Sequence, residues 1–288
     1  MPTTKNLVGS SFQVKASYKS KDGQQVYTIV VNGQTLHVTQ ISAGGSHTCA
    51  LTTVGGVKCW GYNAYGQLGN SSTTDSLTPV NVTGLTSGVA SLTAGQFHTC
   101  AVTTSGGAQC WGYNSYGQLG DNSTTQRLAP VTVSGLTSGV ASLTAGYYHT
   151  CAVTTSGGAQ CWGRNNYGQL GDNSTTQRLA PVTVSGLTSG VASLTAGYYH
   201  TCAVTTSGGA QCWGRNNAGQ LGDNSTTNRL APMAVSGLTS GVASLTAGNY
   251  LTCAVTTSGG AQCWGYNNTG QLGDNSTTRR LTPVDVSP

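Results

Sequence analysis

The chain has 288 residues, a formal net charge of +5, 42 glycines, ten cysteines and only 7% charged residues. Charged residues make up about a quarter of a typical soluble domain, so this composition, which includes no glutamate, does not fit an ordinary cytosolic enzyme. No apolar run approaches the roughly 18 residues that cross a bilayer, and Met1 does not open a signal-peptide pattern.

The positive charge is concentrated at the beginning of the chain. Four of the five lysines lie within the first 21 residues, and from residue 36 onward eight Lys and Arg face six Asp. A nucleic-acid groove needs clustered Lys and Arg to neutralise phosphates. The sequence therefore predicts a solvated polar surface and no nucleic-acid partner.

Residues 1–35 differ from the rest and predict a β meander. The alternating residues 11–18 fit a strand with one buried face, and turn-forming residues follow at 19–23. A second strand is expected over 24–31 and, after an Asn-Gly turn, a third over 34–39. The meander is either the remnant of a preceding domain or an extra sheet on the first repeat, into which it runs directly.

A unit of 51 residues then occurs five times, and all ten cysteines and five tryptophans belong to it. Four short strands in a repeat of about 50 residues indicate a β-propeller blade. In the second unit the strands are expected over residues 89–94, 98–103, 108–112 and 128–133. The predicted fold is all-β, a β-propeller of five repeats after the meander, with units at 36–86, 87–137, 138–188, 189–239 and 240–288.

Five blades must either close a small ring or leave an open arc with unpaired sheet edges. The sequence favours a closed monomeric ring. An open arc that completes itself through a neighbouring chain is the alternative.

Residues 111–120 read W-G-Y-N-S-Y-G-Q-L-G, and the pattern W-G-x-N-x-x-G-Q-L-G recurs in all five units. With an upstream G-x-x-H-T and a downstream proline, it resembles the repeat of the regulator of chromosome condensation over about 250 residues. The resemblance implies a β-propeller, usually of seven blades. The family includes a nucleotide-exchange factor, a plant ultraviolet-B photoreceptor and a bacterial β-lactamase inhibitor, and their common activity is binding a protein surface.

The two cysteines of each unit are expected to pair. Between Cys100 and Cys110, a three-residue hairpin loop with Gly106 in the left-handed conformation places the two cysteines opposite each other. Opposite residues lie about 4.5–5.5 Å apart, within disulfide range. Buried reduced thiols are the alternative; zinc would need four ligands at closer spacing. The predicted disulfides, which imply an oxidising compartment, are Cys49–Cys59, Cys100–Cys110, Cys151–Cys161, Cys202–Cys212 and Cys253–Cys263.

A histidine recurs at one position in four units, and Leu251 replaces it in the fifth, which favours packing or a local hydrogen bond over catalysis. One tryptophan per blade fits a core better than light sensing. The aspartates of the repeated G-D-N-S-T-T loop fit turns better than a calcium site. We therefore expect no metal, no cofactor and no catalytic residue.

The repeats differ from one another before the histidine position, after the Trp-Gly pair and past the D-N-S-T-T loop. Tyr and Arg in loops on a stiff scaffold are typical of a recognition surface, with neutral drift as the alternative. The predicted binding residues are Tyr62, Tyr65, Tyr113, Tyr116, Tyr147, Arg164, Tyr167, Tyr198, Arg215 and Tyr266.

The sequence thus predicts a binding or adhesion module that is extracellular or at the cell surface. Its expected partner is a protein or glycan surface, in isolation or within a larger surface assembly. The alternatives are a soluble protein inhibitor, as in the β-lactamase-inhibiting relatives, and an intracellular scaffold like the exchange factor.

Overall fold

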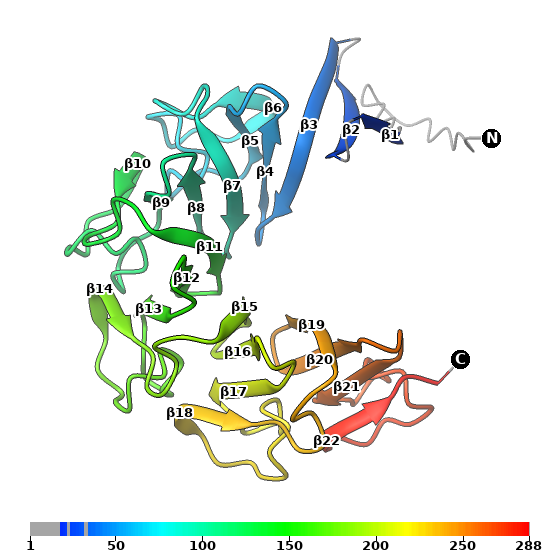
Figure 1. The fold of residues 1–288 in the computed structure, drawn as a ribbon. Coiled ribbons are helices and arrows are strands. Elements are labelled where there is room, and N and C mark those ends of the chain that lie inside the picture. Colours follow the sequence, from blue (N-terminus) through cyan, green and yellow to red (C-terminus); the bar gives the residue numbers. More distant parts are fainter. Residues whose placement is uncertain (1–17, 22–23, 32–33, 288) are drawn as a thin grey trace.

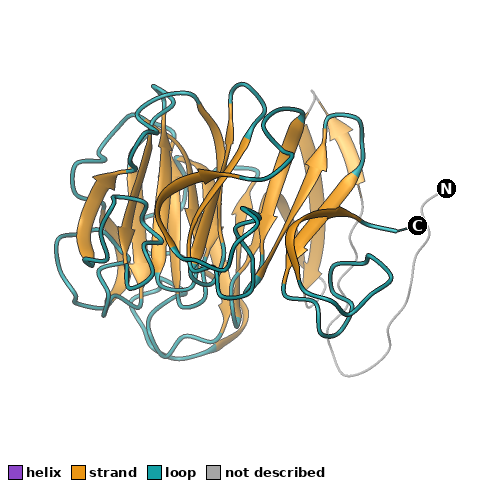
Figure 2. Ribbon diagram, turned by 90° about the horizontal axis from the view of Figure 1, so that it is seen from below, coloured by secondary structure: helices purple, strands orange, loops and turns teal. Residues whose placement is uncertain are grey.

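The computed structural model describes residues 18–21, 24–31 and 34–287, whose strands form five antiparallel sheets. Each sheet holds the four strands of one unit in chain order, and the first sheet carries two more on its inner edge. The sheets stand around an axis like the blades of a propeller, with the first strand of each unit innermost (Figure 1). Seen from below, the strands stand side by side and the loops gather at their two ends (Figure 2).

Every described element is a strand. Blade 1 and its added strands comprise β1 (Tyr18–Lys21), β2 (Gln24–Val31), β3 (Gln34–Ala43), β4 (His47–Thr52), β5 (Val57–Gly61) and β6 (Ser76–Asn81). Blade 2 comprises β7 (Val89–Ala94), β8 (His98–Thr103), β9 (Ala108–Gly112) and β10 (Arg127–Thr132), and blade 3 comprises β11 (Val140–Ala145), β12 (His149–Thr154), β13 (Ala159–Gly163) and β14 (Arg178–Thr183). Blade 4 comprises β15 (Val191–Ala196), β16 (His200–Thr205), β17 (Ala210–Gly214) and β18 (Arg229–Ala234). Blade 5 comprises β19 (Val242–Ala247), β20 (Leu251–Thr256), β21 (Ala261–Gly265) and β22 (Arg280–Asp285).

The predicted blade strands are confirmed, with β10 beginning one residue earlier than expected. At the N-terminus, β1 occupies part of the segment 19–23 that was predicted to turn, and the strand predicted over 11–18 lies outside the described residues except for Tyr18. The third meander strand and the first strand of unit 1 are one continuous strand, β3. The meander therefore extends the sheet of blade 1.

The predicted hairpin geometry brings each cysteine pair together. In blade 2, Cys100 lies opposite Cys110 in the β8–β9 register, and Gly106 has a φ of 80° in the connecting turn. A glycine adopts this left-handed conformation without steric cost. All five units form their own disulfide, each with Cα atoms 4.1 Å apart, and no free cysteine remains.

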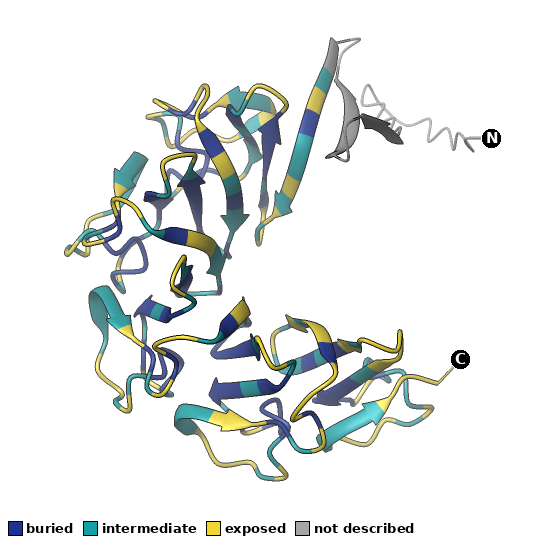
Figure 3. Ribbon diagram, in the orientation of Figure 1, coloured by how far each residue is buried: buried dark blue, intermediate teal, exposed yellow. Residues whose placement is uncertain are grey.

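Four clusters of the hydrophobic core each lie between two successive blades, and a fifth, formed by Val38 and Ala50 with Leu36 and Trp60, lies on the first sheet. The buried segments of the strands recur in every blade (Figure 3). In the second cluster, the Cys100–Cys110 disulfide and Val102 of blade 2 pack against Ala152 and Trp162 of blade 3. Trp162 is fully buried there. The fold is therefore held together by contacts from blade to blade, as in other repeat proteins.

A buried hydrogen-bond chain crosses each of these four junctions. Between blades 2 and 3, Trp162 Nε1 and Thr150 Oγ1 both donate to the carbonyl of Gln118, at 2.9 and 2.8 Å. His98 Nε2 lies 2.8 Å from Thr150 Oγ1. The only proton of Thr150 Oγ1 is donated to Gln118 O, so His98 must donate from Nε2. The Nδ1 of His98 is then an acceptor, and it has no partner among the described residues.

A backbone bond at the outer side completes each junction. Asn122 lies in the left-handed region with a φ of 58°, and its N–H donates to Leu179 O of the next blade at 3.0 Å. Beside this bond, Gly117 lets Leu179 approach so closely that an added Cβ would lie 2.8 Å from the Cα of Leu179. The corresponding backbone donors at the other junctions are Ser71, Asn173 and Asn224.

The five blades form an open arc, and the predicted closed ring is wrong. Blade 5 packs against blade 4, and the sector between blade 5 and blade 1 stays open (Figure 1). Consistent with an open end, Val255 of blade 5 is 45% exposed, whereas its equivalent Val102 in blade 2 is 3% exposed. The curvature is set by the repeated junction, which does not bring the first and fifth blades into contact.

Candidate functional site

The loops that hold most of the differences between repeats lie at one end of the blades. One loop enters the second strand of a blade and the other leaves the third strand, and these strands are antiparallel. The two loops are joined by a backbone bond from Tyr113 N to Phe97 O at 3.0 Å. Gly112 turns the chain there with a φ of 105°, where an added Cβ would lie 2.7 Å from Phe97 O. The same bond occurs in all five blades, so these loops have one fixed relation to each other.

The aromatic side chains on these loops form one continuous network, here called the aromatic band. Every tyrosine and phenylalanine beyond residue 35 belongs to it. Its members are Tyr62, Tyr65, Phe97, Tyr113, Tyr116, Tyr147, Tyr148, Tyr167, Tyr198, Tyr199, Tyr250 and Tyr266.

The rings contact one another across the blade junctions. Tyr65 of blade 1 lies 4.9 Å from Tyr113 of blade 2, centroid to centroid. Tyr147 and Tyr198 of blades 3 and 4 are 3.8 Å apart. Edge-to-face and offset pairs at such distances are favourable beyond the area they bury. The band therefore runs from blade 1 to blade 5 as a connected, pre-ordered surface.

Two arginines are held among the rings at the middle of the band. The guanidinium of Arg164 lies 4.8 Å from the centroid of Tyr116 and 5.1 Å from that of Tyr199. Arg215 lies 5.0 Å from Tyr167 and 5.3 Å from Tyr250. Such cation–π contacts fix the guanidinium groups over the rings.

No carboxylate neutralises these two arginines among the described residues, in which the four ion pairs all involve other arginines. Arg164 donates from an η nitrogen to Tyr199 Oη at 3.2 Å, and its buried Nε has no partner in the described part of the chain. The middle of the band therefore presents two positive charges on an aromatic surface.

Two tyrosine hydroxyls of the band, those of Tyr148 and Tyr198, are held in the protonated form. Burial and hydrogen bonding to Tyr147 raise the pKa of Tyr148 above its ordinary value, and the same two effects, with Tyr199 added, raise that of Tyr198. A neutral phenol can both donate and accept a hydrogen bond. The band is thus aromatic, hydrogen-bonding and cationic at once.

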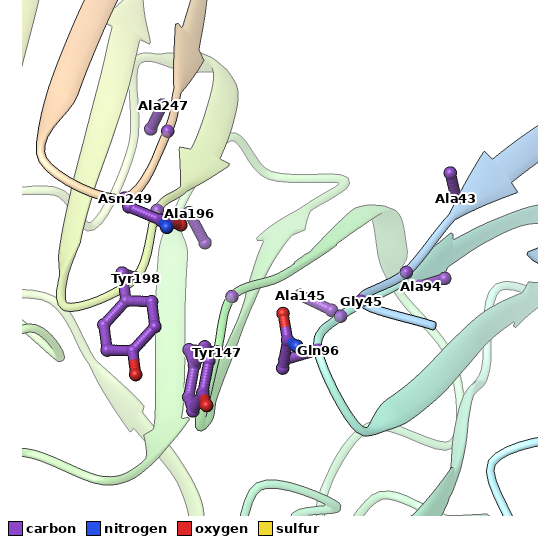
Figure 4. A pocket seen from close by; sticks show the side chains of 15 residues that line it. Ala43, Gly45, Ala94, Gln96, Ala145, Tyr147, Ala196, Tyr198, Ala247 and Asn249 are labelled. Carbon is purple, nitrogen blue, oxygen red and sulfur yellow. The ribbon is translucent and has the colours of Figure 1, made fainter. Parts of the chain in front are cut away.

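A cavity of about 250 Å³ lies where the inner strands of all five blades converge. Ala and Gly residues at the ends of these strands line the cavity together with Gln96, Tyr147, Tyr198 and Asn249 (Figure 4). Tyr147 and Tyr198 also belong to the aromatic band, so the cavity and the band form one surface.

All ten predicted binding residues lie in the band or are stacked on it, which their positions in the sequence alone did not establish. The prediction did not include Phe97, Tyr148, Tyr199 and Tyr250. Each of these four stands directly before the histidine position of its unit, where blade 1 has Ser46. The recurrence of an aromatic residue at this position is the sequence signal that could have identified these four residues.

At the third place where the repeats differ, the arginines of blades 2 to 5 make structural contacts. Arg127 pairs with Asp121 at 2.7 Å, and the aspartate also accepts bonds from Asn114 and Ser123. Burial would raise the pKa of Asp121, but the bonds from Ser123, Arg127 and Asn114 outweigh it and hold that pKa below its ordinary value. Both carboxylate oxygens are thus engaged by protein donors, which agrees with the predicted turn.

The four histidines of the repeated position, His47, His98, His149 and His200, are neutral structural groups. Burial lowers the pKa of His98 and of His149 to about 3, and that of His47 and His200 to about 4. No group of three His, Cys, Asp or Glu side chains that could hold a metal ion is present among the described residues. The described part of the chain also contains no helix long and apolar enough to cross a membrane.

Comparison with known proteins identifies the family of the chain. The family model of the RCC1-like domain matches residues 9–288. The ultraviolet-B receptor UVR8 of Arabidopsis thaliana is 34% identical over 252 residues, which cover 86% of this chain and 57% of that protein. The probable E3 ubiquitin-protein ligase HERC4 of Homo sapiens is 35% identical over 207 residues, 70% of this chain and 20% of the ligase. The chain therefore spans little more than half of one relative and a fifth of the other.

Solved structures agree in fold. Human WBSCR16 superposes with a TM-score of 0.78 at 25% identity, covering 90% of this chain and 69% of that one. Prp20p of Saccharomyces cerevisiae gives a TM-score of 0.77 at 22% identity, covering 87% and 63%. With its repeated W-G-x-N-x-x-G-Q-L-G motif and its four-stranded blades, the chain belongs to the RCC1-like domain family.

Proposed function

We propose that the chain is a binding module outside the reducing cytosol, at or beyond the cell surface, and that the aromatic band engages a protein partner. The observation that carries the proposal is the continuity of the band. Eleven tyrosines and Phe97 contact one another across five blades, although the sequence places them in eight separate loops. Neutral drift at exposed loops does not by itself collect every tyrosine and phenylalanine of the repeats on one surface.

The energetics of interfaces favour this surface for binding. Tyrosine and arginine are enriched among residues whose loss costs about 2 kcal/mol or more of binding free energy. Rings that are already packed lose little conformational freedom when a partner docks. The uncompensated charges of Arg164 and Arg215 favour a partner with carboxylates facing the middle of the band.

Relatives of the same fold support a role in binding. Prp20p binds Gsp1p and histones, and UVR8 is by name a receptor. These activities belong to those proteins. For this chain we infer protein binding through its own surface residues.

The disulfides support the proposed compartment. All ten cysteines are paired, one bridge to each blade. Disulfides persist in secreted and surface-exposed proteins and are rare in the reducing cytosol. An extracellular location and a surface suited to binding are both features of adhesion proteins, so we propose adhesion to a cell surface as the activity.

A combined variant tests the proposal. Tyr65→Ala, Tyr116→Ala, Arg164→Ala and Tyr167→Ala together remove the centre of the band. The matched control is Ser105→Ala, Ser156→Ala, Ser207→Ala and Ser258→Ala, because these exposed serines lie in the hairpin turns at the opposite end of the blades. Fluorescently labelled proteins are applied to a panel of bacterial and eukaryotic cells, and bound protein is measured by flow cytometry.

We expect the band variant to lose at least about tenfold in attachment, the control variant to bind like the unaltered chain, and proteinase treatment of the cells to abolish binding. Equal attachment of the two variants would refute the assignment of the band. Loss of attachment after periodate treatment, but not after proteinase treatment, would replace the protein partner by a glycan.

A further inference from the structure

Each internal junction forms between two different faces of neighbouring blades, and one face of each kind is left at the two ends of the arc. The leading face of a blade is the side that packs on the preceding blade, and the trailing face is the side that receives the next one. Blade 1 has no preceding blade and blade 5 has no following blade among the described residues. Within the part of the chain that the structure describes, no other blade packs on the leading face of blade 1 or on the trailing face of blade 5.

The leading face of blade 1 leaves Leu77 and part of Trp60 exposed, while Val38 and Ala50 on the same face are buried in a cluster with Leu36 and Trp60. Leu77 is 81% exposed, whereas its equivalents at the internal junctions, such as Leu128, are half-buried against the preceding blade. Trp60 is half-buried, whereas the four other tryptophans are fully buried. Within the described residues Trp60 Nε1 donates to no acceptor, although Trp111 Nε1 donates to Gln67 O.

The trailing face of blade 5 retains the receiving geometry. Asn275 keeps the left-handed φ of 55° that points the N–H of its equivalents at the next blade. Gly270 and Gly273 keep their positive φ angles of 77° and 68°, and no side chain of another blade lies over them. Gln271 supplies the carbonyl that corresponds to Gln67 O and receives no Trp or Thr donor from the described residues.

We propose that these two faces bind each other between copies, so that the chain associates head to tail through a fifth junction of the same kind. Leu77 of one copy would lie over Gly270 of its neighbour, and Trp60 would lie over Gly273 and donate to Gln271 O. The occupant is a second copy because the chain itself holds both halves of this pattern and joins them four times. Since two different faces meet, the association is heterologous and can continue from copy to copy.

One residue departs from the internal pattern. Leu251 stands where the other blades have a histidine that donates to the threonine of the next blade. The equivalent threonine of the joining copy is Thr48, which can still donate to the Gln271 carbonyl as Thr99 does to Gln67. The intermolecular junction therefore lacks one hydrogen bond of the internal one and is expected to be weaker and concentration-dependent.

Two charge substitutions separate the faces. Leu77→Arg places a charge on the leading face, and Val255→Arg places one on the trailing face, where Val255 is 45% exposed. Val54→Arg is the matched control, since Val54 is 73% exposed in a hairpin turn that belongs to neither face. Thermal unfolding confirms that each variant is folded, because exposed substitutions alter stability by about 0.5 kcal/mol or less.

Sedimentation velocity over a wide range of protein concentration measures the association state of the unaltered chain and of each variant. The unaltered chain and Val54→Arg are expected to form dimers and longer series as concentration rises. Leu77→Arg and Val255→Arg are each expected to stay monomeric alone, with association weakened at least about 100-fold. A mixture of these two variants retains one intact leading face and one intact trailing face and is expected to form dimers that do not grow further.

Three results would overturn the proposal. The unaltered chain could remain monomeric at every concentration, which would assign the open faces to some other occupant. The Leu77→Arg variant could still associate alone, which would place the contact elsewhere. The mixture of the two face variants could fail to dimerise, which would exclude a junction between unlike faces.

Discussion

Buried polar side chains replace the large apolar residues that a Gly-rich chain lacks. Asn165 is fully buried and donates from Nδ2 to Asp172 Oδ1, Ser174 O and Thr176 O, at 2.9 to 3.1 Å. Its Oδ1 accepts the N–H of Leu170 at 3.0 Å. One amide therefore organises the whole loop between the third and fourth strands of a blade.

Replacing this amide is expected to be costly. In Asn165→Leu, the carbonyls of Ser174 and Thr176 and the buried N–H of Leu170 lose this partner, which we expect to cost about 3 kcal/mol of unfolding free energy. Asn166→Leu is the control, since its neighbouring side chain is exposed. Urea denaturation measures both, and a similar midpoint for the two variants would show that the loop does not depend on the amide.

The histidines make stability depend on pH. In the folded chain burial holds the four pKa values at about 3 to 4, whereas in the unfolded chain they return to about 6.5. Because the unfolded state binds more protons below pH 6.5, stability is complete above that pH and is lost as the pH falls toward 4. The expected slope is about 1.4 kcal/mol per pH unit for each histidine.

His200→Leu is expected to reduce this slope by about a quarter, since one of four such groups is removed. The variant also loses its bond to Thr252, so it starts from a lower stability at neutral pH. Urea midpoints between pH 7.5 and pH 4.5 separate the two effects. An unchanged slope would mean that other groups control the acid sensitivity.

Among the elements, the hairpin of the second and third strands determines both the disulfide and the junction. Its bridge lies on the trailing face, under the tryptophan of the next blade. In blade 5 that cover is missing, and Cys253 is only half-buried, whereas the first cysteine of every other blade is fully buried.

The Cys253–Cys263 disulfide is therefore expected to react first with a thiol reductant. Attack requires access to sulfur, and in blades 1 to 4 access requires the next blade to move away. Brief treatment followed by alkylation and peptide mapping should label Cys253 and Cys263 at least about tenfold faster than Cys151 and Cys161. Uniform labelling would indicate that all five blades open equally.

The strands and the bridges could be predicted because both depend on local spacing. The three-residue loop ending at Gly106 fixes the register of Cys100 and Cys110, whatever the rest of the chain does. The aromatic band depends on contacts such as that of Tyr65 with Tyr113, which exist only once two blades are placed side by side. Ring closure likewise depends on the angle of the junction, to which Gly117 and Leu179 contribute, and no local pattern encodes it.

At the scale of the molecule, stability is the sum of single blades and of junctions between neighbours, as expected for a quasi-one-dimensional repeat protein. The four internal junctions use corresponding residues, from His47, Thr99 and Gln67 to His200, Thr252 and Gln220. No described contact requires a particular number of blades between the two ends.

Deleting one complete unit is therefore expected to leave a folded arc. Removing residues 138–188 joins Thr137 to Ser189, which restores the Thr-Ser sequence found at the original boundary, and blade 4 then meets blade 2 through the same side chains. Far-ultraviolet circular dichroism should retain its shape per residue, and all remaining cysteines should be oxidised. A deletion of about 25 residues within the same segment is the control and should not fold. Failure of the whole-unit deletion would show that the arc has long-range requirements.

The interchangeable junction also has a genetic consequence. Neighbouring units are so alike in amino-acid sequence that misaligned recombination between matching stretches of their coding sequence would add or remove whole units in frame. Each product would keep the same first and last blade and an unbroken aromatic band of different length. The area of the proposed binding surface can therefore change in steps of one blade by a single recombination event, without any substitution.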